Sequence, residues 1–413
     1  MDVKPGYKQT EVGVIPEDWE LSQLGNNLRE PIRNGYSPVC SSQPTGVWIL
    51  SLSAVSPNGL NPSGVKHAPA NDPRVLQNLL VVDDVVVSRS NTPDRVGLAG
   101  VYRGEPTPCA YPDLLMRIRL GDSLNPEYLL FCLLSSPGRR YFSDNARGSS
   151  NSMVKIDRTI LESFPIPLPP TKAEQEAIAA ALSDADALIE SLEQLIAKKR
   201  NIKQGAMQEL LTGSKRLLGF CGEWKVKRIA EIASPKCEKN SLGEQLTVLT
   251  CSKHLGFVDS LGYFKNQVFS RDTSGYKIIK RGEIGYPANH VEEGSIGLQS
   301  FYDRALVSPI YVVFSVNEEV DSYFLHRLLK LECYRQKFET ATCSSVDRRG
   351  SLRWPAFSEI TVSLPPLAEQ TAISAILSDM DAELSTLESK LSKARQIKQG
   401  MMQELLTGRV RLI

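Results

Sequence analysis

Residues 173–217 read AEQEAIAAALSDADALIESLEQLIAKKRNIKQGAMQELLTGSKRL, and residues 368–412 repeat most of this stretch as AEQTAISAILSDMDAELSTLESKLSKARQIKQGMMQELLTGRVRL. About 28 of the 45 aligned positions are identical, at a constant offset of 195 residues. Self-similarity at a fixed offset is the signature of a duplicated structural unit. The chain is therefore expected to contain one unit twice.

Both copies have the composition and the boundaries of long helices. Two prolines precede each copy, Gly213 and Gly408 follow them, and Ala, Leu, Glu, Lys and Gln fill the interior. At 1.5 Å per residue, about 40 helical residues form a rod of roughly 60 Å. The sequence thus predicts two long rods, within residues 169–213 and 364–413.

Apolar residues recur along each copy in alternating steps of four and three, which is the spacing of a coiled-coil seam. The two seams consist of Ile178, Leu182, Ala185, Ile189, Leu192 and Ile196, and of Ile373, Leu377, Met380, Leu384, Leu387 and Leu391. A rod with one apolar stripe is not stable alone in water, and its nearest partner is the tethered second copy.

The charges within each copy favour an antiparallel pair. Acidic residues such as Asp186 and Asp381 lie nearer the start of a copy, and basic residues such as Lys203 and Lys398 lie nearer its end. Antiparallel pairing places acidic segments against basic ones. The charges alone would also suit the solvated face of an ordinary helical hairpin.

The bulk composition is that of a soluble protein. The chain has 413 residues, of which 41% are hydrophobic, enough for two or three domains with their own cores. Neither a membrane span nor secretion is expected, because we find no apolar run of 18 residues and no signal-like start. Eight scattered cysteines without a C-x-x-C pair fit reduced thiols in a cytoplasm, and four isolated histidines do not predict a metal site.

Each rod is preceded by a globular block that is rich in short β-type runs. The blocks open near Trp19 and Trp224, and their later segments resemble each other, as in residues 125–142 and 321–338. We therefore predict an α+β fold with two mixed α/β domains, related by an approximate two-fold axis and separated by an antiparallel coiled coil. The expected boundaries are 1–168 and 214–363 for the domains, with the rods at 169–213 and 364–413.

This organisation resembles the DNA-specificity subunit of Type I restriction-modification enzymes. The matching residues are GVIPEDWELSQLG at 13–25, the PLPP-x-x-AEQ-x-AI type of helix start, and the two KQG-x-MQELLTG helix ends. One departure is that PPTKAEQ at 169–175 carries one residue more than PPLAEQ at 365–370. The resemblance covers the whole chain, and it implies that the globular blocks are target-recognition domains.

The resemblance implies a non-catalytic, cytoplasmic subunit that binds a bipartite target in double-stranded DNA, one half-site per domain. It also implies recruitment of two adenine methyltransferase subunits and, in complexes that cut DNA, two restriction subunits. No cofactor is expected on this chain, since S-adenosylmethionine and ATP would be bound by the partner subunits. In agreement, the sequence contains no [DN]-P-P-Y methyltransferase motif, no G-x-x-x-x-G-K-[ST] loop and no H-E-x-x-H motif.

Polar loops at corresponding places in the two domains are the candidate DNA contacts, because Arg, Asn and Ser can reach base edges and phosphates. The predicted residues are Arg89, Ser90, Asn91, Arg95, Arg147, Ser149, Ser150, Asn151 and Ser152 in the first domain, and Asn289, His290, Ser344, Ser345, Arg348, Arg349 and Ser351 in the second. For any single residue, a role in forming the turn is the better interpretation. As sets at corresponding places in the two domains, they favour contact with DNA.

The outward faces of both rods are the candidate partner surfaces, since a repeated surface offers two equivalent docking sites. The predicted residues are Lys203, Gln204, Gln208, Lys398, Gln399 and Gln403. Two other functions remain open at this point: a coiled-coil scaffold that binds protein partners, and an enzyme with its active site in one block. Neither accounts as well for the duplicated KQG-x-MQELLTG ends.

Overall fold

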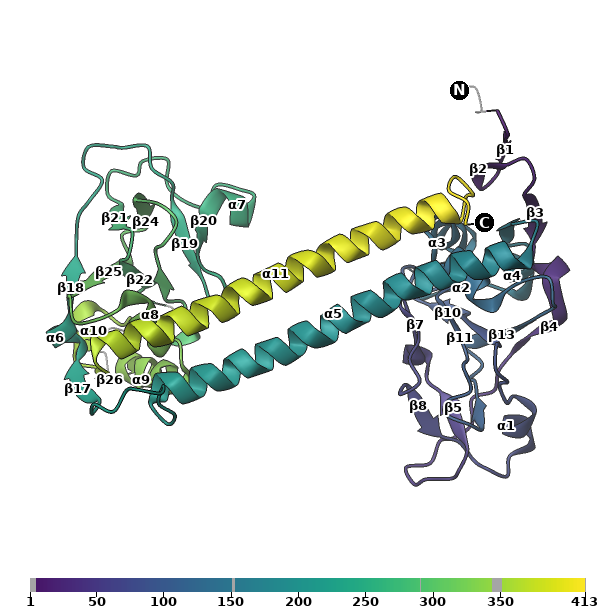
Figure 1. Ribbon diagram of the computed structural model, residues 1–413, viewed down its shortest axis with the longest axis horizontal. Coiled ribbons are helices and arrows are strands. Elements are labelled where there is room, and N and C mark those ends of the chain that lie inside the picture. The colour runs from purple at the N-terminus through teal and green to yellow at the C-terminus, as the bar shows by residue number, and fades with distance from the viewer. Residues whose placement is uncertain (1–4, 151–152, 290, 344–350, 413) are drawn as a thin grey trace. The chain divides into compact units, whose positions relative to one another are not determined.

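The computed structural model describes residues 5–150, 153–289, 291–343 and 351–412. It divides into two compact units (Figure 1). The first unit contains Met1–Glu193 and Ser389–Ile413, and the second contains Gln194–Glu388. Each unit therefore combines one globular block with part of both long helices, whereas the sequence-based boundaries separate blocks from rods.

The first unit is built on an antiparallel sheet of four strands in the order β11-β9-β13-β4. These strands are Ala99–Val101, Val85–Ser88, Leu115–Leu120 and Leu28–Asn34. The inner strand β9 reads Val-Val-Val-Ser and is buried throughout, as expected for a β-branched strand covered on both faces. In register, Met116 of β13 lies opposite Val87 on one side and Asn34 on the other.

Smaller sheets and short helices complete this block. The sheets are β12-β5-β8 (Cys109–Ala110, Trp48–Leu50, Val65–His67), β10-β15-β14 (Ser90–Asn91, Met153–Lys155, Arg147–Ser150), β16-β3 (Pro165–Leu168, Glu20–Gln23), β1-β2 (Tyr7–Thr10, Gly13–Pro16) and β6-β7 (Val55–Ser56, Gly59–Leu60). The helices are α1 (Pro73–Gln77), α2 (Pro126–Leu134), α3 (Ser136–Asn145) and α4 (Arg158–Glu162), with 3-10 turns at Leu24–Asn27 and Leu52–Ala54.

The second unit repeats this plan with a four-stranded sheet in the order β18-β25-β22-β23. These strands are Ala233–Lys236, Tyr311–Val316, Ile284–Pro287 and Gly297–Leu298. The further strand pairs are β17-β26 (Lys225–Arg228, Thr361–Leu364), β19-β20 (Leu249–Ser252, Gly256–Asp259) and β21-β24 (Lys277–Lys280, Arg304–Val307). The helices are α6 (Ile229–Ile232), α7 (Ser260–Phe264), α8 (Ser322–Leu329), α9 (Glu332–Cys343) and α10 (Trp354–Ser358), with a 3-10 turn at Val291–Glu293.

The two predicted rods are the helices α5 (Lys172–Thr212) and α11 (Leu367–Leu405). Each ends before a glycine with a left-handed backbone, at φ +72° for Gly213 and φ +67° for Gly408, a conformation that suits a helix C-terminus. All twelve predicted seam residues are buried or half-buried, which confirms the periodicity. Gly408 also packs against Pro16 and Trp19, where an added Cβ would lie only 2.5 Å from the proline ring.

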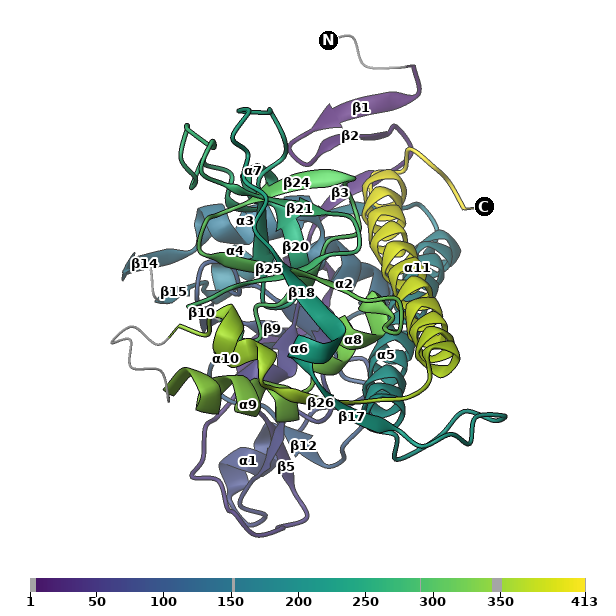
Figure 2. The same cartoon turned by 90° about the vertical axis from the view of Figure 1, so that its left-hand side faces the viewer.

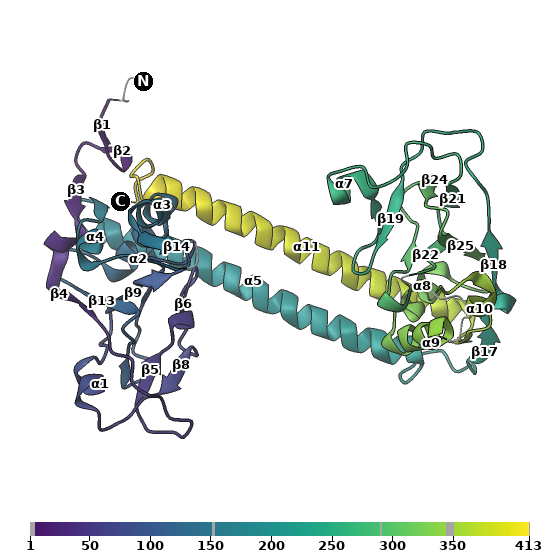
Figure 3. The same ribbon diagram turned by 180° about the vertical axis from the view of Figure 1, so that it is seen from behind.

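Within the first unit, the start of α5 runs antiparallel to the end of α11 (Figures 1 and 3). Arg411 binds Glu174, Lys398 donates to Asp186 at 2.5 Å, and Arg395 donates to Glu193 at 2.6 Å. The partner on α11 moves toward the helix start as the residue number on α5 rises. The predicted antiparallel direction is therefore correct.

The second unit contains the same three ion pairs, with every residue shifted by 195 positions. Arg216 binds Glu369 through two hydrogen bonds of 2.6 Å, Lys203 donates to Asp381, and Arg200 donates to Glu388 at 2.7 Å. The duplication thus extends from the sequence to individual contacts.

Each globular core encloses the start of one long helix and the end of the other. Ile178 and Leu182 of α5 and Leu405 of α11 belong to the core that contains Trp19. In the second unit Ile373 and Leu377 of α11 join Leu210 and Leu211 of α5 in the core around Phe324. The helices are therefore anchored at both ends by burial of apolar side chains.

Equivalent hydrogen bonds also link α2 and α8 to the long helices. The side chain of Gln175 accepts from the backbone N–H of Asn125 at 2.9 Å, and Gln370 accepts from that of Asp321 at 3.0 Å. Asn125 and Asp321 in turn cap α2 and α8 by accepting from the backbone of Tyr128 and Phe324. These contacts fix the direction in which each long helix leaves its block.

A leucine pair on α5 tests how much the helix depends on this burial. Leu182 is fully buried, whereas Leu188 is 55% exposed. We expect Leu182→Ala to lower the free energy of unfolding by about 2–5 kcal/mol, because it leaves a cavity in the core. Leu188→Ala, the matched control, should change it by less than about 0.5 kcal/mol. Urea denaturation of the full chain measures both, and equal losses would contradict the assignment of the seam.

His326 on α8 gives the second unit a pH dependence. Desolvation lowers the pKa of its imidazole from 6.5 to about 4, while Nε2 lies 3.3 Å from the carbonyl of Ile296. Between these two pH values the unfolded chain binds a proton there and the folded chain does not. Stability should therefore fall as the pH drops from 6.5 to about 4, at up to about 1.4 kcal/mol per pH unit.

The variant His326→Leu should flatten this part of the pH profile, since leucine stands at the corresponding position of the first unit as Leu130. Chemical denaturation of both proteins between pH 4.5 and 7.5 measures the difference. An unchanged slope in the variant would show that His326 is already protonated in the folded state.

Candidate nucleic-acid interface

The two polar segments predicted for the first domain meet in one small sheet. Strand β15 pairs with β10 through Lys155 and Ser90, and with β14 through Lys155 and Arg147 (Figure 2). The backbone N–H of Ile156 also donates to the carbonyl of Arg89 at 2.9 Å. Segments about 60 residues apart in sequence therefore form a continuous polar edge.

The predicted residues of this edge differ in how accessible they are. Arg147 has an 81% exposed side chain, 3.7 Å from Asp157, and Arg89 is half-buried. Asn91 accepts from the backbone of Thr92 at 3.0 Å, so its side chain shapes the turn. Of Ser149 and Ser150 only the strand backbone is described, and Asn151 and Ser152 lie outside the described residues.

Two of the predicted contacts belong to the support of the edge. Ser90 is 1% exposed, and its hydroxyl has no hydrogen-bond partner among the described residues. Arg95 donates to the carbonyl of Val55 at 3.4 Å, which ties the turn to β6. Ser90 was predicted to reach a base edge, but other residues cover its side chain.

In the second unit the corresponding segments also meet. The backbone N–H of Leu352 donates to the carbonyl of Ala288 at 2.7 Å, which is the counterpart of the Ile156 to Arg89 contact. Asn289 and Ser351 consequently line one cavity of about 950 Å³. The predicted His290, Ser344, Ser345, Arg348 and Arg349 lie outside the described residues.

Three exposed cationic residues were missing from the sequence-based set. Lys155 is exposed on β15, Arg33 is exposed near the end of β4, and Lys236 is exposed at the end of β18. Arg33 and Lys236 lie more than 50 residues in sequence from the predicted loops, so no local pattern indicates them. The alternation of apolar and polar residues along β4 and β18 could have placed Arg33 and Lys236 on an exposed face.

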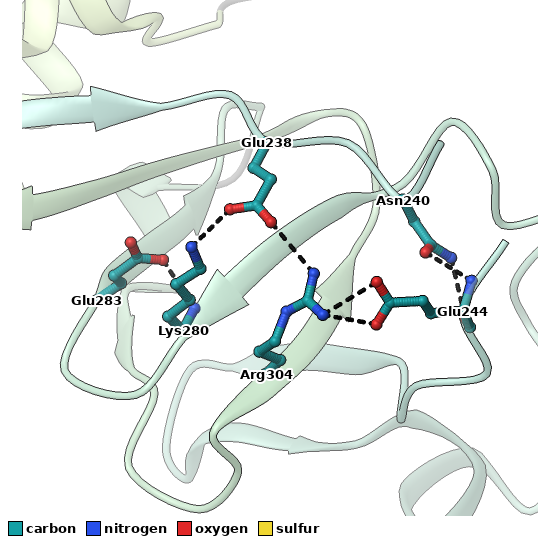
Figure 4. A network of polar contacts seen from close by, with 6 residues as sticks. All are labelled: Glu238, Asn240, Glu244, Lys280, Glu283 and Arg304. Carbon is teal, nitrogen blue, oxygen red and sulfur yellow. Dashed lines mark hydrogen bonds and ion pairs between the residues drawn. The ribbon is translucent and has the colours of Figure 1, made fainter. Parts of the chain in front are cut away.

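A polar network supports the segment that follows Lys236 (Figure 4). Arg304 of β24 donates to Glu238 at 3.2 Å and to Glu244 at 2.7 Å, and Lys280 lies 2.7 Å from Glu238. The hydrogen bond from Lys280 lowers the pKa of Glu238, and burial raises the pKa of Glu283. These carboxylates are thus bound to cations or backbone groups of the same unit, and residues 238–244 are held against β21 and β24.

The predicted partner-binding residues separate into two groups. Gln204, Gln208, Gln399 and Gln403 are exposed, in agreement with an outward face. Lys203 and Lys398 were expected there too, but they form the ion pairs with Asp381 and Asp186 between the helices. Polar character alone cannot separate these two faces, because an antiparallel pair uses lysines in its own contact.

A cavity of about 980 Å³ in the first unit lies beside the exposed glutamines of α11. Gln399, Met402 and Gln403 form one wall, and α3 contributes Pro137 and Tyr141. This wall contains both apolar and polar groups, a mixture that is also found at protein-protein interfaces.

Among the described residues, no cluster of three or more His, Cys, Asp or Glu side chains could hold a metal ion. Within the same residues, no helix has both the length and the apolar character needed to cross a membrane.

Comparison with known proteins identifies the family. The sequence model of the Type I restriction modification DNA specificity domain matches residues 83–199 and 222–396. The MjaX type I restriction enzyme specificity subunit of Methanocaldococcus jannaschii is 25% identical over 98% of this chain and 97% of its own length. The MjaVIII specificity subunit of the same organism is 27% identical over 62% of this chain and 64% of its own length.

Two solved structures have the same fold. The S subunit of a Type I restriction-modification system from M. genitalium superposes with a TM-score of 0.57 at 15% identity and covers 98% of both chains. A chain from a type I restriction-modification system, solved in work on its complex assembly, superposes with a TM-score of 0.56 at 14% identity, over 96% of this chain and 99% of that one. Because the family model matches most of the chain in two repeats, the protein belongs to the specificity subunits of Type I restriction-modification systems, which are non-catalytic components that recognise the DNA target.

Proposed function

We propose that this chain recognises a bipartite target in double-stranded DNA and that each unit contacts one half-site. The observation that carries this proposal is the repeated backbone contact, Ile156 to Arg89 in one unit and Leu352 to Ala288 in the other. In both units this contact brings a turn after a buried strand against the segment that follows a Ser- and Arg-containing loop. Two domains that recognise different DNA sequences need the same backbone arrangement with different side chains on it.

The charge distribution supports local binding of DNA. Net charge is only +1, so general attraction to phosphates is weak. The exposed cations Arg147 and Lys155 nevertheless flank the edge of the first unit, and Lys236 lies beside that of the second. Phosphate contacts of this kind position the protein, while the polar side chains between them read the bases.

Specificity should therefore be modular. Replacing Arg89 and Arg147 together with Ala should relax the preference roughly tenfold at one or two base pairs in one half-site, since each lost base contact reduces discrimination. Asn289→Ala should act only on the other half. Arg103→Ala, which removes an arginine that is 72% exposed and paired with Glu127, is the matched control and should leave both halves unchanged.

The measurement is single-molecule sequencing of modified adenines in host DNA, with the wild-type gene, with each variant and without the gene. Loss of specificity in both halves after a change in one unit would contradict the assignment of one half-site per unit. A scaffold that only binds proteins predicts no sequence-dependent modification by any variant, and binding that is insensitive to salt.

We further propose that the exposed glutamines of α5 and α11 bind two methyltransferase subunits. Gln204 and Gln208 occupy the same positions in one repeat as Gln399 and Gln403 in the other. Equivalent surfaces bind equivalent partners, so one chain would carry two copies. The methyltransferase subunits and two restriction subunits would bind S-adenosylmethionine and ATP. The complex would act in the cytoplasm, where the DNA is accessible.

Replacing single glutamines with arginine tests whether two methyltransferase subunits bind. Gln403→Arg and Gln208→Arg should each reduce the complex from two methyltransferase subunits to one, and the double variant should bind none, because a bulky charge then occupies the contact. Gln396→Arg, at an exposed position just before the repeated KQG motif, is the control and should keep two. Native mass spectrometry at saturating partner counts the subunits, and a single copy with the wild-type chain would refute the two-site arrangement.

A further inference from the structure

The cavity of about 950 Å³ in the second unit has walls with one sign of charge. It lies between β18, the β21 and β25 strands, and the start of α10, and its polar lining consists of Lys236, Lys277, Asn289, Ser351 and Arg353. No Asp or Glu is found among the described residues that line it. Such a concave surface attracts an anion, because low-dielectric walls strengthen the field of the cations.

The carboxylates nearest in sequence to Lys236 are already paired. Glu238 binds Lys280 and Arg304, and Glu244 binds Arg304 (Figure 4). Within the described chain, neither Lys236 nor Lys277 forms an ion pair with a carboxylate. No described carboxylate neutralises Lys277, and Lys236, which also lines a neighbouring cavity with Glu238 and Glu283, forms an ion pair with neither of them.

The walls of this cavity are preorganised. The ammonium of Lys277 donates to the carbonyl of Tyr311 at 2.5 Å, which holds the lysine along β25. Trp354 packs against Phe314 and Phe357 at ring separations of 5.5 and 6.0 Å, which fixes the start of α10 next to Ser351 and Arg353. A ligand would thus meet side chains whose positions are set by the core.

We propose that this cavity is where the second unit holds the phosphodiester backbone of its half-site. Lys236 contacts a phosphate, Lys277 and Arg353 contribute positive charge to the wall, and Asn289 and Ser351 face the bases from the same wall. This inference rests on the proposed recognition of DNA and adds the residues that position it. Lys236, Lys277 and Arg353 come from three separate segments, so only the fold brings them together.

The first unit has a cation at a comparable place. Strand β4 is the edge strand next to β13, as β18 is the edge strand next to β25. Arg33 lies within the last two residues of β4, and Lys236 is the last residue of β18. Both are exposed. Both units therefore share an exposed cation at the end of the edge strand, where it can contact the phosphodiester backbone of DNA.

Salt dependence tests the role of Lys236 in the full chain, assembled with its methyltransferase partner and bound to a duplex that carries the mapped target. Lys236→Ala should lower the slope of log affinity against log salt by about 0.9, which corresponds to one lost phosphate contact. Lys236→Arg should restore the slope. Lys225→Ala, which removes another exposed lysine from a strand of the same unit, is the control and should leave the slope unchanged.

Cys237 supplies a second readout that does not depend on substitution. Cys237 is a free, exposed cysteine that lines this cavity and the neighbouring one, and Cys221 is a free, exposed cysteine elsewhere in the same unit. The target duplex should slow alkylation of Cys237 by N-ethylmaleimide at least fivefold and leave Cys221 unaffected. Peptide mass spectrometry follows both thiols in one sample.

The outcomes separate this proposal from the broader one. Equal slopes for Lys236→Ala and Lys225→Ala, with unprotected Cys237 in a complex that still binds its target, would overturn the cavity assignment and leave DNA recognition intact. Equal protection by inorganic polyphosphate and by the duplex, at the same phosphate concentration, would identify a general anion site and also overturn it. If the assembled complex bound no duplex at all, both proposals would fail.

Discussion

The antiparallel contact between the start of one long helix and the end of the other is the constraint on which the rest of the structure depends. A helix of 41 residues with one apolar stripe needs a partner along that stripe, and the chain supplies it from its own second copy. Arg411 with Glu174, and Arg216 with Glu369, hold the two equivalent junctions. Glu174 and Glu369 are nearly or fully buried there, so each needs its arginine. Each unit is consequently complete only when both helices take part.

The helix junctions are the same in both units, whereas the surfaces of the globular blocks differ. The junction residues, the glutamine contacts to α2 and α8, and the glycine after each long helix occur twice, with partners at equivalent positions. The blocks differ in the details that would meet DNA, as with Arg33 and Lys236 on their edge strands. Arg327 in the second unit contacts Asp381, whereas in the first unit Phe131 lies under the ammonium of Lys398. A constant frame with variable edges suits a subunit whose relatives are named for specificity.

The sequence predicted features that depend on periodicity and missed features that depend on distant contacts. The seam, the helix ends and the antiparallel direction follow from spacing and charge order along one segment. The sequence also placed residues 89–95 and 147–152 in one candidate set, and the β10-β15-β14 sheet joins parts of both segments. Burial of Ser90 and pairing of Lys203 could not be read from residue type, because both faces of a turn or a helix accept polar side chains. Lys236, Lys277 and Arg353 together span more than 100 residues of sequence and converge only in the folded unit.

The central claim, that each unit binds its own half-site, is tested most directly by hydrogen exchange of the full complex on three duplexes. One carries the intact target, and the others have the first or the second half scrambled, all at saturating concentration. The account predicts that scrambling one half abolishes protection of β10, β14 and β15 alone, and that scrambling the other abolishes protection of β18 and the 288–289 turn alone. Simultaneous loss in both units with either scrambled duplex would contradict it.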